Sequence, residues 1–196
     1  MKRTNKKFSY KDISIEDLET EISRERYKHS FSKFLKNTIA VLLIITSISS
    51  IIATLFIPVI EVTNSSMEPL LNNGEIVLSI KTTKFKTGDI VAFYQGNKIL
   101  IKRVIGVQGD WINIDEGGNV YVNGEKIKEK YVKELLRGNS EIDYPIQVED
   151  NSLFVLSDDR ATTTDSRNID IGNIKKENII GKIFFKIWPL KRIGTV

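Results

Sequence analysis

The sequence predicts an all-β domain, a sandwich or barrel, that follows a single N-terminal transmembrane helix. The run Ile39–Ile60 contains no charged residue, whereas residues 61–196 consist of short β-branched stretches separated by turn signals. No helical period extends over any length of this second part. With 196 residues, the chain is long enough for one or two domains with a sizeable core.

The apolar run is long enough to cross a membrane. Its 22 residues span about 33 Å as a helix, and the hydrocarbon core is about 30 Å thick. A cleavable signal peptide has a shorter apolar core and ends in small residues, whereas this run ends in Phe56-Ile57-Pro58-Val59-Ile60. We therefore expect an uncleaved anchor over residues 37–60. The alternative, a buried helix of a soluble protein, is disfavoured because the run has no polar face.

Charge is unevenly distributed along the chain. Residues 1–36 contain ten Lys/Arg and six Asp/Glu, so the net charge of +4 belongs to this segment and the remainder is neutral. Residues 61–80 contain neither Lys nor Arg, so the positive-inside rule places the N-terminus in the cytoplasm and residues 61–196 outside. We expect residues 1–36 to be a mobile cytoplasmic tail attracted to anionic lipid. The neutral remainder argues against a nucleic-acid binder.

Seven segments after the anchor are predicted to be strands. They are rich in Val, Ile, Phe and Tyr and are bounded by turns that contain Gly, Asn and Asp. The predicted strands are Glu75–Lys81, Asp89–Tyr94, Lys98–Val107, Trp111–Asp115, Val120–Val122, Leu153–Leu156 and Ile179–Trp188. The segment at about 116–150 is more polar, which predicts an insertion that is less regular than the rest of the sheet.

The near absence of histidine and cysteine restricts the possible chemistry. The chain has no cysteine, and its single histidine, His29, lies before the apolar run. Disulfides and thiolate metal sites are therefore unavailable. Mechanisms that pair Ser or Cys with His, or that use several His ligands, are excluded unless His29 serves. We expect neither a metal nor a cofactor.

A serine and a lysine are the best candidates for a catalytic pair. Ser66 follows the apolar run closely, and a serine hydroxyl needs an adjacent base to act as a nucleophile. Lys102 shares its strand face with Leu100 and Val104, so desolvation would lower its pKa toward that of a base. Arg103 adds positive charge nearby, on the opposite face. The alternatives are an ordinary loop serine and an edge-strand lysine whose ammonium reaches water.

A polar loop further along the chain carries paired charges. It runs from Ser157 to Arg167 and contains two Asp-x-Arg units, Asp158/Arg160 and Asp165/Arg167. In one interpretation these are surface ion pairs, each worth less than ~1 kcal/mol. In the other, the loop lies behind the lysine and supplies a hydroxyl to orient the amine and an ion pair to hold the loop.

Together these residues resemble the motifs of type I signal peptidases, the membrane-anchored serine proteases that remove signal peptides from exported proteins. Four motifs occur in the order typical of that family. They are Ser66-Met67-Glu68-Pro69-Leu70-Leu71 for Ser-Met-x-Pro-Thr-Leu, Gly88-Asp89-Ile90-Val91 for the Gly-Asp motif, Lys102-Arg103-Val104-Ile105-Gly106-Val107-Gln108-Gly109-Asp110 for Lys-Arg-Val-x-Gly-x-x-Gly-Asp, and Ser157 through Arg167 for Gly-Asp-Asn-Arg-x-x-Ser-x-Asp-Ser-Arg. A lysine at position 102, rather than histidine, is typical of the bacterial branch.

The resemblance implies a fold, an activity and a role for each site residue. It implies a signal-peptidase-like β domain outside the cell membrane, with Ser66 as nucleophile and Lys102 as general base. The oxyanion hole would combine the Ser66 N–H with Asn64, where relatives have Ser or Gly. The other implied residues are Thr163, Asp165 and Arg167 near the lysine, and Met67, Leu71 and Ile101 in the substrate pocket. The substrate would be an extended preprotein segment with a small-x-small cleavage site.

The same resemblance implies binding partners for the protein and leaves open alternatives to the proteolytic function. The expected partners are preprotein signal peptides, the lipid bilayer and the nearby protein export machinery, with no nucleic acid. Leu70, Ser157 and Asp159 depart from the usual Thr, Gly and Asn, which would lower activity or narrow the substrate set. The main alternative is a non-catalytic or narrow-specificity assembly factor for surface proteins, although retention of both Ser66 and Lys102 argues against it. A self-cleaving repressor of the SOS response would carry a DNA-binding domain instead of an anchor.

Overall fold

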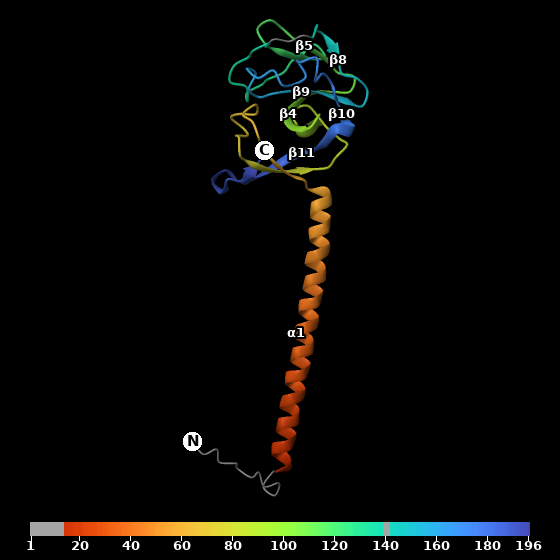
Figure 1. The fold of residues 1–196 in the computed structure, drawn as a ribbon, viewed down its shortest axis with the longest axis vertical. Coiled ribbons are helices and arrows are strands. Elements are labelled where there is room, and N and C mark those ends of the chain that lie inside the picture. Colours follow the sequence, from red (N-terminus) through yellow and green to blue (C-terminus); the bar gives the residue numbers. More distant parts are fainter. Residues whose placement is uncertain (1–13, 139–141) are drawn as a thin grey trace. The chain divides into compact units, whose positions relative to one another are not determined.

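The computed structural model describes residues 14–138 and 142–196, which divide into two units (Figure 1). The first unit consists mostly of helix α1 (Ile15–Phe56), and the second is a β domain that begins at Ala53. The predicted tail lies partly outside the described residues, because its first part is residues 1–13.

Helix α1 extends well beyond the apolar run toward the N-terminus. The Ser14 hydroxyl accepts a hydrogen bond from the Glu16 N–H at 3.1 Å, which caps the helix start, and Glu16 complements the helix dipole in the first turn. Within the charged part, Lys28 pairs with Glu25 at 2.7 Å, three residues apart on one face. Residues 15–36 are therefore helical, and their mobility and cytoplasmic location stay a prediction.

The helix ends earlier than predicted, at Phe56. Pro58 has no N–H to donate, and its ring disfavours a helical residue before it. The next residues form strand β1 (Val59–Glu61), and Ile60 is buried in the core of the β domain. The anchor predicted over residues 37–60 is therefore too long at this end. Helix α1 is nonetheless long and apolar enough to cross a membrane.

The β domain contains two antiparallel sheets (Figure 1). The larger sheet has the strand order β1-β2-β11-β3-β4-β9-β10, with β12 paired to β11, and the smaller has the order β7-β6-β5-β8. Besides β1, the larger sheet comprises β2 (Ile76–Ile80), β3 (Ile90–Gln95), β4 (Lys98–Val107), β9 (Ser152–Leu156), β10 (Ile174–Lys175), β11 (Ile179–Trp188) and β12 (Gly194–Thr195). The smaller comprises β5 (Trp111–Ile114), β6 (Val120–Val122), β7 (Glu125–Lys126) and β8 (Ile146–Gln147). The 3-10 helices η1 (Lys176–Asn178) and η2 (Leu190–Arg192) flank β11.

All seven predicted strands are present, and their ends agree with the prediction to within one residue. The structure confirms the predicted all-β class with one N-terminal helix. The strands that the sequence did not predict, β1, β7, β8, β10 and β12, have only two or three residues. Such short strands show no period that could be recognised in a sequence.

Strand β4 is buried on both of its faces between β3 and β9. Residues 100–106 are all buried, whereas Lys98 and Ile99 at the strand start are exposed. Ile101 packs into the cluster that includes the segment after β1, and Leu100 and Val104 pack into a second cluster on the other face. By strand alternation, residue 102 shares the face of the second cluster.

The smaller sheet packs against the larger one through a third apolar cluster. Ile112 and Ile114 of β5 lie against Ile105 of β4 and against Phe154 and Leu156 of β9. The polar insertion is therefore packed against β4, which carries the predicted lysine, and against β9, which precedes the predicted polar loop.

Candidate active site

Ser66 and Lys102 lie in direct contact. The Lys102 Nζ donates a hydrogen bond to the Ser66 Oγ at 2.6 Å, although the two residues are 36 positions apart. Ser66 sits on the turn between β1 and β2, where it is 3% exposed, and Lys102 lies in the middle of β4 with no exposed surface. The sequence predicted this pair, and the fold brings it together.

The environment of Lys102 favours the neutral amine. Burial lowers the pKa of Lys102 to about 8, from an ordinary value of 10.5. The Asp165 carboxylate opposes this shift, and the Arg167 guanidinium reinforces it. Desolvation is the dominant cause, as expected from the apolar face of β4. The nearby positive charge comes from Arg167 and not from Arg103, which pairs with Asp158 instead.

Asp165 and Arg167 form a buried ion pair close to the lysine. The Arg167 Nη2 lies 2.8 Å from Asp165 Oδ2, and its Nε donates to Oδ1 at 2.9 Å. Asp165 also accepts the Ser157 N–H at 2.9 Å. Burial alone would raise the pKa of Asp165, but the bonds from Arg167 and Ser157 hold it below its ordinary value. The pair therefore stays charged and holds the polar loop, as one of the two interpretations of that loop predicted.

A second buried ion pair joins the polar loop to β4. Arg103 donates from its Nε and Nη2 to the two carboxylate oxygens of Asp158 at 2.7 and 2.6 Å, in the bidentate geometry that is strong for arginine. Its Nη1 donates to the Gly88 carbonyl at 3.0 Å. The motif residues Gly88, Arg103 and Asp158 are thus brought together in one contact.

The polar insertion contributes residues that the sequence did not single out. The guanidinium of Arg103 stacks over the Tyr131 ring at 3.9 Å, and Arg160 forms a buried ion pair with Glu129. The Tyr131 hydroxyl donates to Glu129 at 2.8 Å. In the sequence, Glu129 and Tyr131 lie in a run of mixed charges that looks like a solvated surface, and no local signal distinguishes them.

The insertion also reaches the back of the Asp165–Arg167 pair. Arg167 Nη1 donates to the carbonyls of Leu136 and Arg137 at 3.2 Å each, and to the Arg160 carbonyl at 3.0 Å. These carbonyls satisfy the donors of a guanidinium that has almost no access to water. The segment at the end of the insertion therefore closes the site on this side.

Asn64 contacts Ser66 through its side-chain oxygen. Asn64 Oδ1 accepts hydrogen bonds from the Ser66 N–H at 3.1 Å and from the Ser66 hydroxyl at 2.6 Å. The hydroxyl has one proton, so in this arrangement Lys102 donates to Oγ while Oγ donates to Asn64. The Asn64 amide thus faces Ser66 with its acceptor and not with its NH2 donor.

Thr163 is half-buried in the same loop, near the Asp165–Arg167 pair. Within residues 14–138 and 142–196, no hydrogen bond joins its hydroxyl to Lys102, although the resemblance places a hydroxyl beside the lysine. Its methyl group lies near Gly138, at the end of the insertion. Thr163 remains a predicted site residue without a direct contact to the amine.

A groove of about 750 Å³ reaches Asn64, the residue that accepts a hydrogen bond from the Ser66 hydroxyl. It is lined by the segment from β1 to Asn64, by the start of β4 and by Thr164. The residues predicted for the substrate pocket, Met67, Leu71 and Ile101, do not line this groove. They are buried in the core cluster beneath the turn that carries Ser66.

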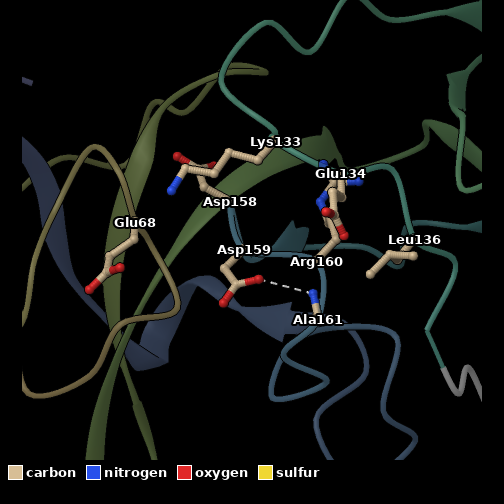
Figure 2. Close-up of a pocket in the computed structure, with 8 residues that line it drawn as sticks. All are labelled: Glu68, Lys133, Glu134, Leu136, Asp158, Asp159, Arg160 and Ala161. Atoms are coloured by element: carbon tan, nitrogen blue, oxygen red, sulfur yellow. Dashed lines mark hydrogen bonds between the residues drawn. The ribbon is translucent and has the colours of Figure 1, made fainter.

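A smaller pocket of about 180 Å³ adjoins the turn on the side of the polar loop, as Figure 2 shows. Glu68, Asp159 and Lys133 are among its lining residues, and Asp159 accepts the Ala161 N–H at 3.1 Å. The Asp159 N–H donates to the Ser66 carbonyl at 3.0 Å, which ties the pocket wall to the serine. Of the three departures, Asp159 faces this pocket, whereas the buried Ser157 hydroxyl has no hydrogen-bond partner within the described chain.

The described part of the chain contains no preformed metal-binding site. There, no group of three or more His, Cys, Asp or Glu side chains could hold a metal ion.

Comparison with known proteins identifies the family. The family model for signal peptidases, peptidase S26, matches residues 35–188. Signal peptidase I P of Bacillus subtilis subsp. natto is 36% identical, over 71% of this chain and 80% of the relative. Signal peptidase I of Bacillus licheniformis is 31% identical, over 89% and 97% of the two chains. Signal peptidase I of Streptococcus pneumoniae serotype 4 is 28% identical, over 85% and 99%.

The chain therefore belongs to the signal peptidase family, peptidase S26, whose members are serine proteases. This confirms the predicted resemblance and the enzyme class. A crystal structure of a signal peptidase I from Enterococcus faecalis V583 covers 50% of this chain and 96% of its own, with 24% identity and a TM-score of 0.42.

Proposed function

We propose that this chain is a membrane-bound serine endopeptidase that cleaves signal peptides from exported preproteins after small-x-small sites, with Ser66 as nucleophile and Lys102 as general base. The observation that carries the proposal is the 2.6 Å contact between the Ser66 hydroxyl and a fully buried lysine amine. Membership of the signal peptidase family supports the substrate class.

In the proposed reaction, neutral Lys102 accepts the hydroxyl proton as Ser66 Oγ attacks the scissile carbonyl. The resulting ammonium then donates this proton to the leaving amine, which forms the mature N-terminus. Lys102 next removes a proton from a water molecule that hydrolyses the acyl-enzyme, and Ser66 recovers its hydroxyl. A pKa of about 8 supports this cycle, because the amine is partly neutral near neutral pH and can still donate when protonated.

The oxyanion would be bound by the Ser66 N–H and by Asn64. Both Ser66 donors are bound to Asn64 Oδ1 in the substrate-free chain, at 3.1 and 2.6 Å. Substrate binding must therefore turn the Asn64 side chain, which frees the Ser66 N–H and lets the amide NH2 face the substrate oxygen. Loss of one such donor typically costs about 10²–10³ in rate.

The groove suits an extended peptide. Its two long walls are the segment from β1 to Asn64 and the exposed start of β4, whose backbone could pair with an added strand. Met67, Leu71 and Ile101 would form the floor of the small-residue pockets, after a modest opening of the core that they occupy. Such floors would limit the substrate to small side chains.

Helix α1 would anchor the enzyme in the cell membrane, with the N-terminus in the cytoplasm. Its length and apolar character and the basic residues before the apolar run support this orientation. Ser66 is the tenth residue after Phe56, so it lies at most about 35 Å of extended chain from the helix end. This reach matches a substrate whose signal segment is still in the bilayer beside the export machinery.

The test is cleavage of a preprotein with an Ala-x-Ala site by the detergent-solubilised full chain. Ser66→Ala and Lys102→Met should abolish cleavage while the β domain remains folded. Ser65→Ala is the matched control, because Ser65 is adjacent and exposed, and it should retain activity. If the wild type leaves several such preproteins intact, the non-catalytic assembly factor becomes the better proposal. If Lys102→Met stays active, another group must serve as the base.

A further inference from the structure

Two cations hold the segment that follows Ser66. Lys186 Nζ, from β11, donates a hydrogen bond to the Leu70 carbonyl at 2.9 Å. Arg192 Nη2, from η2, donates to the Pro69 carbonyl at 3.0 Å and to the Leu70 carbonyl at 3.3 Å. Both donors come from the C-terminal part of the chain, more than a hundred residues after the turn that they contact.

A buried carboxylate joins these two cations. Glu75 Oε2 lies 2.9 Å from Lys186 Nζ, and Glu75 Oε1 lies 2.6 Å from Arg192 Nη1. Glu75 is 2% exposed and Lys186 is 6% exposed. Replacing a buried ion pair by apolar side chains is often neutral or stabilising, so stability alone is weak grounds for such a triad. The triad is better explained by its effect on the geometry of the turn that carries Ser66.

The turn forms two hydrogen bonds within itself, and its Ser66, Pro69 and Leu70 carbonyls bind donors from elsewhere in the chain. The Glu68 N–H donates to the Ser65 carbonyl at 3.0 Å, and the Leu71 N–H donates to the Met67 carbonyl at 2.9 Å. At the start of the turn, the Ser66 carbonyl is held by Asp159, as described above. The two cations bind the far end of the same turn, at Pro69 and Leu70, so the segment that begins with Ser66 is held at both of its ends.

We infer that Glu75, Lys186 and Arg192 form a clamp that positions the nucleophile turn, Ser66–Leu71, against Lys102. The inference rests on the proposed function, because it assigns these residues a part in presenting Ser66. A displacement of about 1 Å from a change outside the reacting groups can lower the rate about 10²-fold. Charge-assisted bonds to two consecutive carbonyls are short and directional, which suits this task.

The clamp lies outside the four sequence motifs, the last of which ends at Arg167. Arg192 also lies outside residues 35–188, which the family model matches. Strand β11 and helix η2, which carry Lys186 and Arg192, therefore have a role beyond the structure of the larger sheet. They determine where the turn of Ser66 sits.

The experiment compares Lys186→Met with the wild type as detergent-solubilised full chains, in preprotein cleavage well below the unfolding temperature. We expect kcat to fall about 10-fold or more while KM changes less than about twofold, because the change affects the alignment of Ser66 and not the groove. Lys186→Arg keeps a charged donor and should recover most of kcat. Arg192 is partly exposed, so Arg192→Gln should lower kcat less than Lys186→Met does. If Lys186→Met does not fold, Arg192→Gln replaces it as the test variant.

Lys182→Met is the matched control. Lys182 lies on the same strand and pairs with Asp89 at 2.7 Å, but it does not touch the turn. Its replacement also removes a lysine from a buried carboxylate, although the Lys182 side chain is 32% exposed and that of Lys186 only 7%, so a loss of stability from this cause would affect both variants. If Lys182→Met lowers kcat as much as Lys186→Met does, or if Lys186→Met keeps the wild-type kcat, the clamp has no positioning role.

Hydrogen exchange separates failure of the clamp from failure of the proposed function. The Leu71 amide should exchange about 10-fold faster in Lys186→Met and unchanged in Lys182→Met, because only the first frees the end of the turn. This result holds whether or not the chain cleaves preproteins. An inactive wild type with the expected exchange would overturn the function and keep the clamp as a constraint on the turn. An active wild type with unchanged exchange in Lys186→Met would overturn the clamp alone.

Discussion

Replacing Lys102 by methionine should make the β domain more stable at neutral pH. Methionine approximates the shape of the neutral lysine side chain and removes a charge that is buried without a carboxylate partner. A pKa lowered from 10.5 to about 8 corresponds to about 3 kcal/mol against the folded state when the lysine is protonated. Loss of the hydrogen bond to Ser66 offsets about 1–2 kcal/mol of the gain, which leaves about 1–2 kcal/mol net.

The gain should depend on pH with a definite sign. Below pH 8, Lys102 is protonated in both the folded and the unfolded chain, so the destabilisation is fully expressed. Between about pH 8 and 10.5 the unfolded chain binds more protons than the folded one, so the wild type gains stability as pH rises. The advantage of Lys102→Met should therefore shrink across this range, and above it the lost hydrogen bond to Ser66 should leave the variant about 1–2 kcal/mol less stable than the wild type.

Urea unfolding followed by tryptophan fluorescence measures this effect. Both tryptophans, Trp111 and Trp188, lie in the β domain, so the signal reports on that unit of the full chain in non-ionic detergent. The variants are compared at pH 7 and pH 10, with Ser66→Ala to isolate the lost hydrogen bond. A Lys102→Met chain that is less stable than the wild type at pH 7 would refute the account. So would a difference that does not change between the two pH values.

Three further outcomes follow from the same geometry. The value of kcat/KM should rise about tenfold per pH unit below pH 8 and level off above it, because only neutral Lys102 accepts the proton. Glu129→Gln should lower the free energy of unfolding by about 3 kcal/mol in urea, because it leaves the buried Arg160 without its carboxylate. Gly181→Ala should cost about 1–3 kcal/mol in thermal unfolding, because its Cβ would lie 2.8 Å from the Ile80 carbonyl oxygen.

The strands and the Ser66–Lys102 pair could be predicted because their signals are local. Strand β4 is a continuous β-branched run between two turns, and the lysine within it has apolar neighbours on its own face. The serine lies in a short motif whose residue types are rare in combination. Each signal is contained within about ten residues, so it does not depend on which distant segment packs nearby.

The supporting carboxylates Glu75 and Glu129 could not be predicted, because their partners are distant in sequence, unlike the Asp165–Arg167 pair. Glu129 pairs with Arg160, and Glu75 pairs with Lys186, across 31 and 111 positions. A charged residue in a polar segment has the same local pattern whether it is solvated or buried in an ion pair. The orientation of Asn64 is likewise a property of the folded turn, since either end of its amide could face Ser66.

The end of the anchor shows the limit of length and hydropathy as signals. The run Ile39–Ile60 is uncharged throughout, yet its last residues pair with β2 instead of continuing the helix. The deciding feature is Pro58, which ends the helix, together with a sheet edge ready to accept Val59–Glu61. Apolar side chains suit both the bilayer and a protein core, so hydropathy cannot distinguish the two.

The distribution of buried charge explains why Lys102, alone among the described lysines, has a strongly lowered pKa. In the described residues, four other buried cations each have a carboxylate within 3 Å; the pairs are Arg103–Asp158, Arg160–Glu129, Arg167–Asp165 and Lys186–Glu75. Lys102 has a serine hydroxyl in that place. A carboxylate at that distance would stabilise the ammonium and raise its pKa, which would leave no base at neutral pH. Among the described residues, each buried cation with a structural contact is thus neutralised by a carboxylate, and the unpaired one is the lysine that accepts a proton in the proposed mechanism.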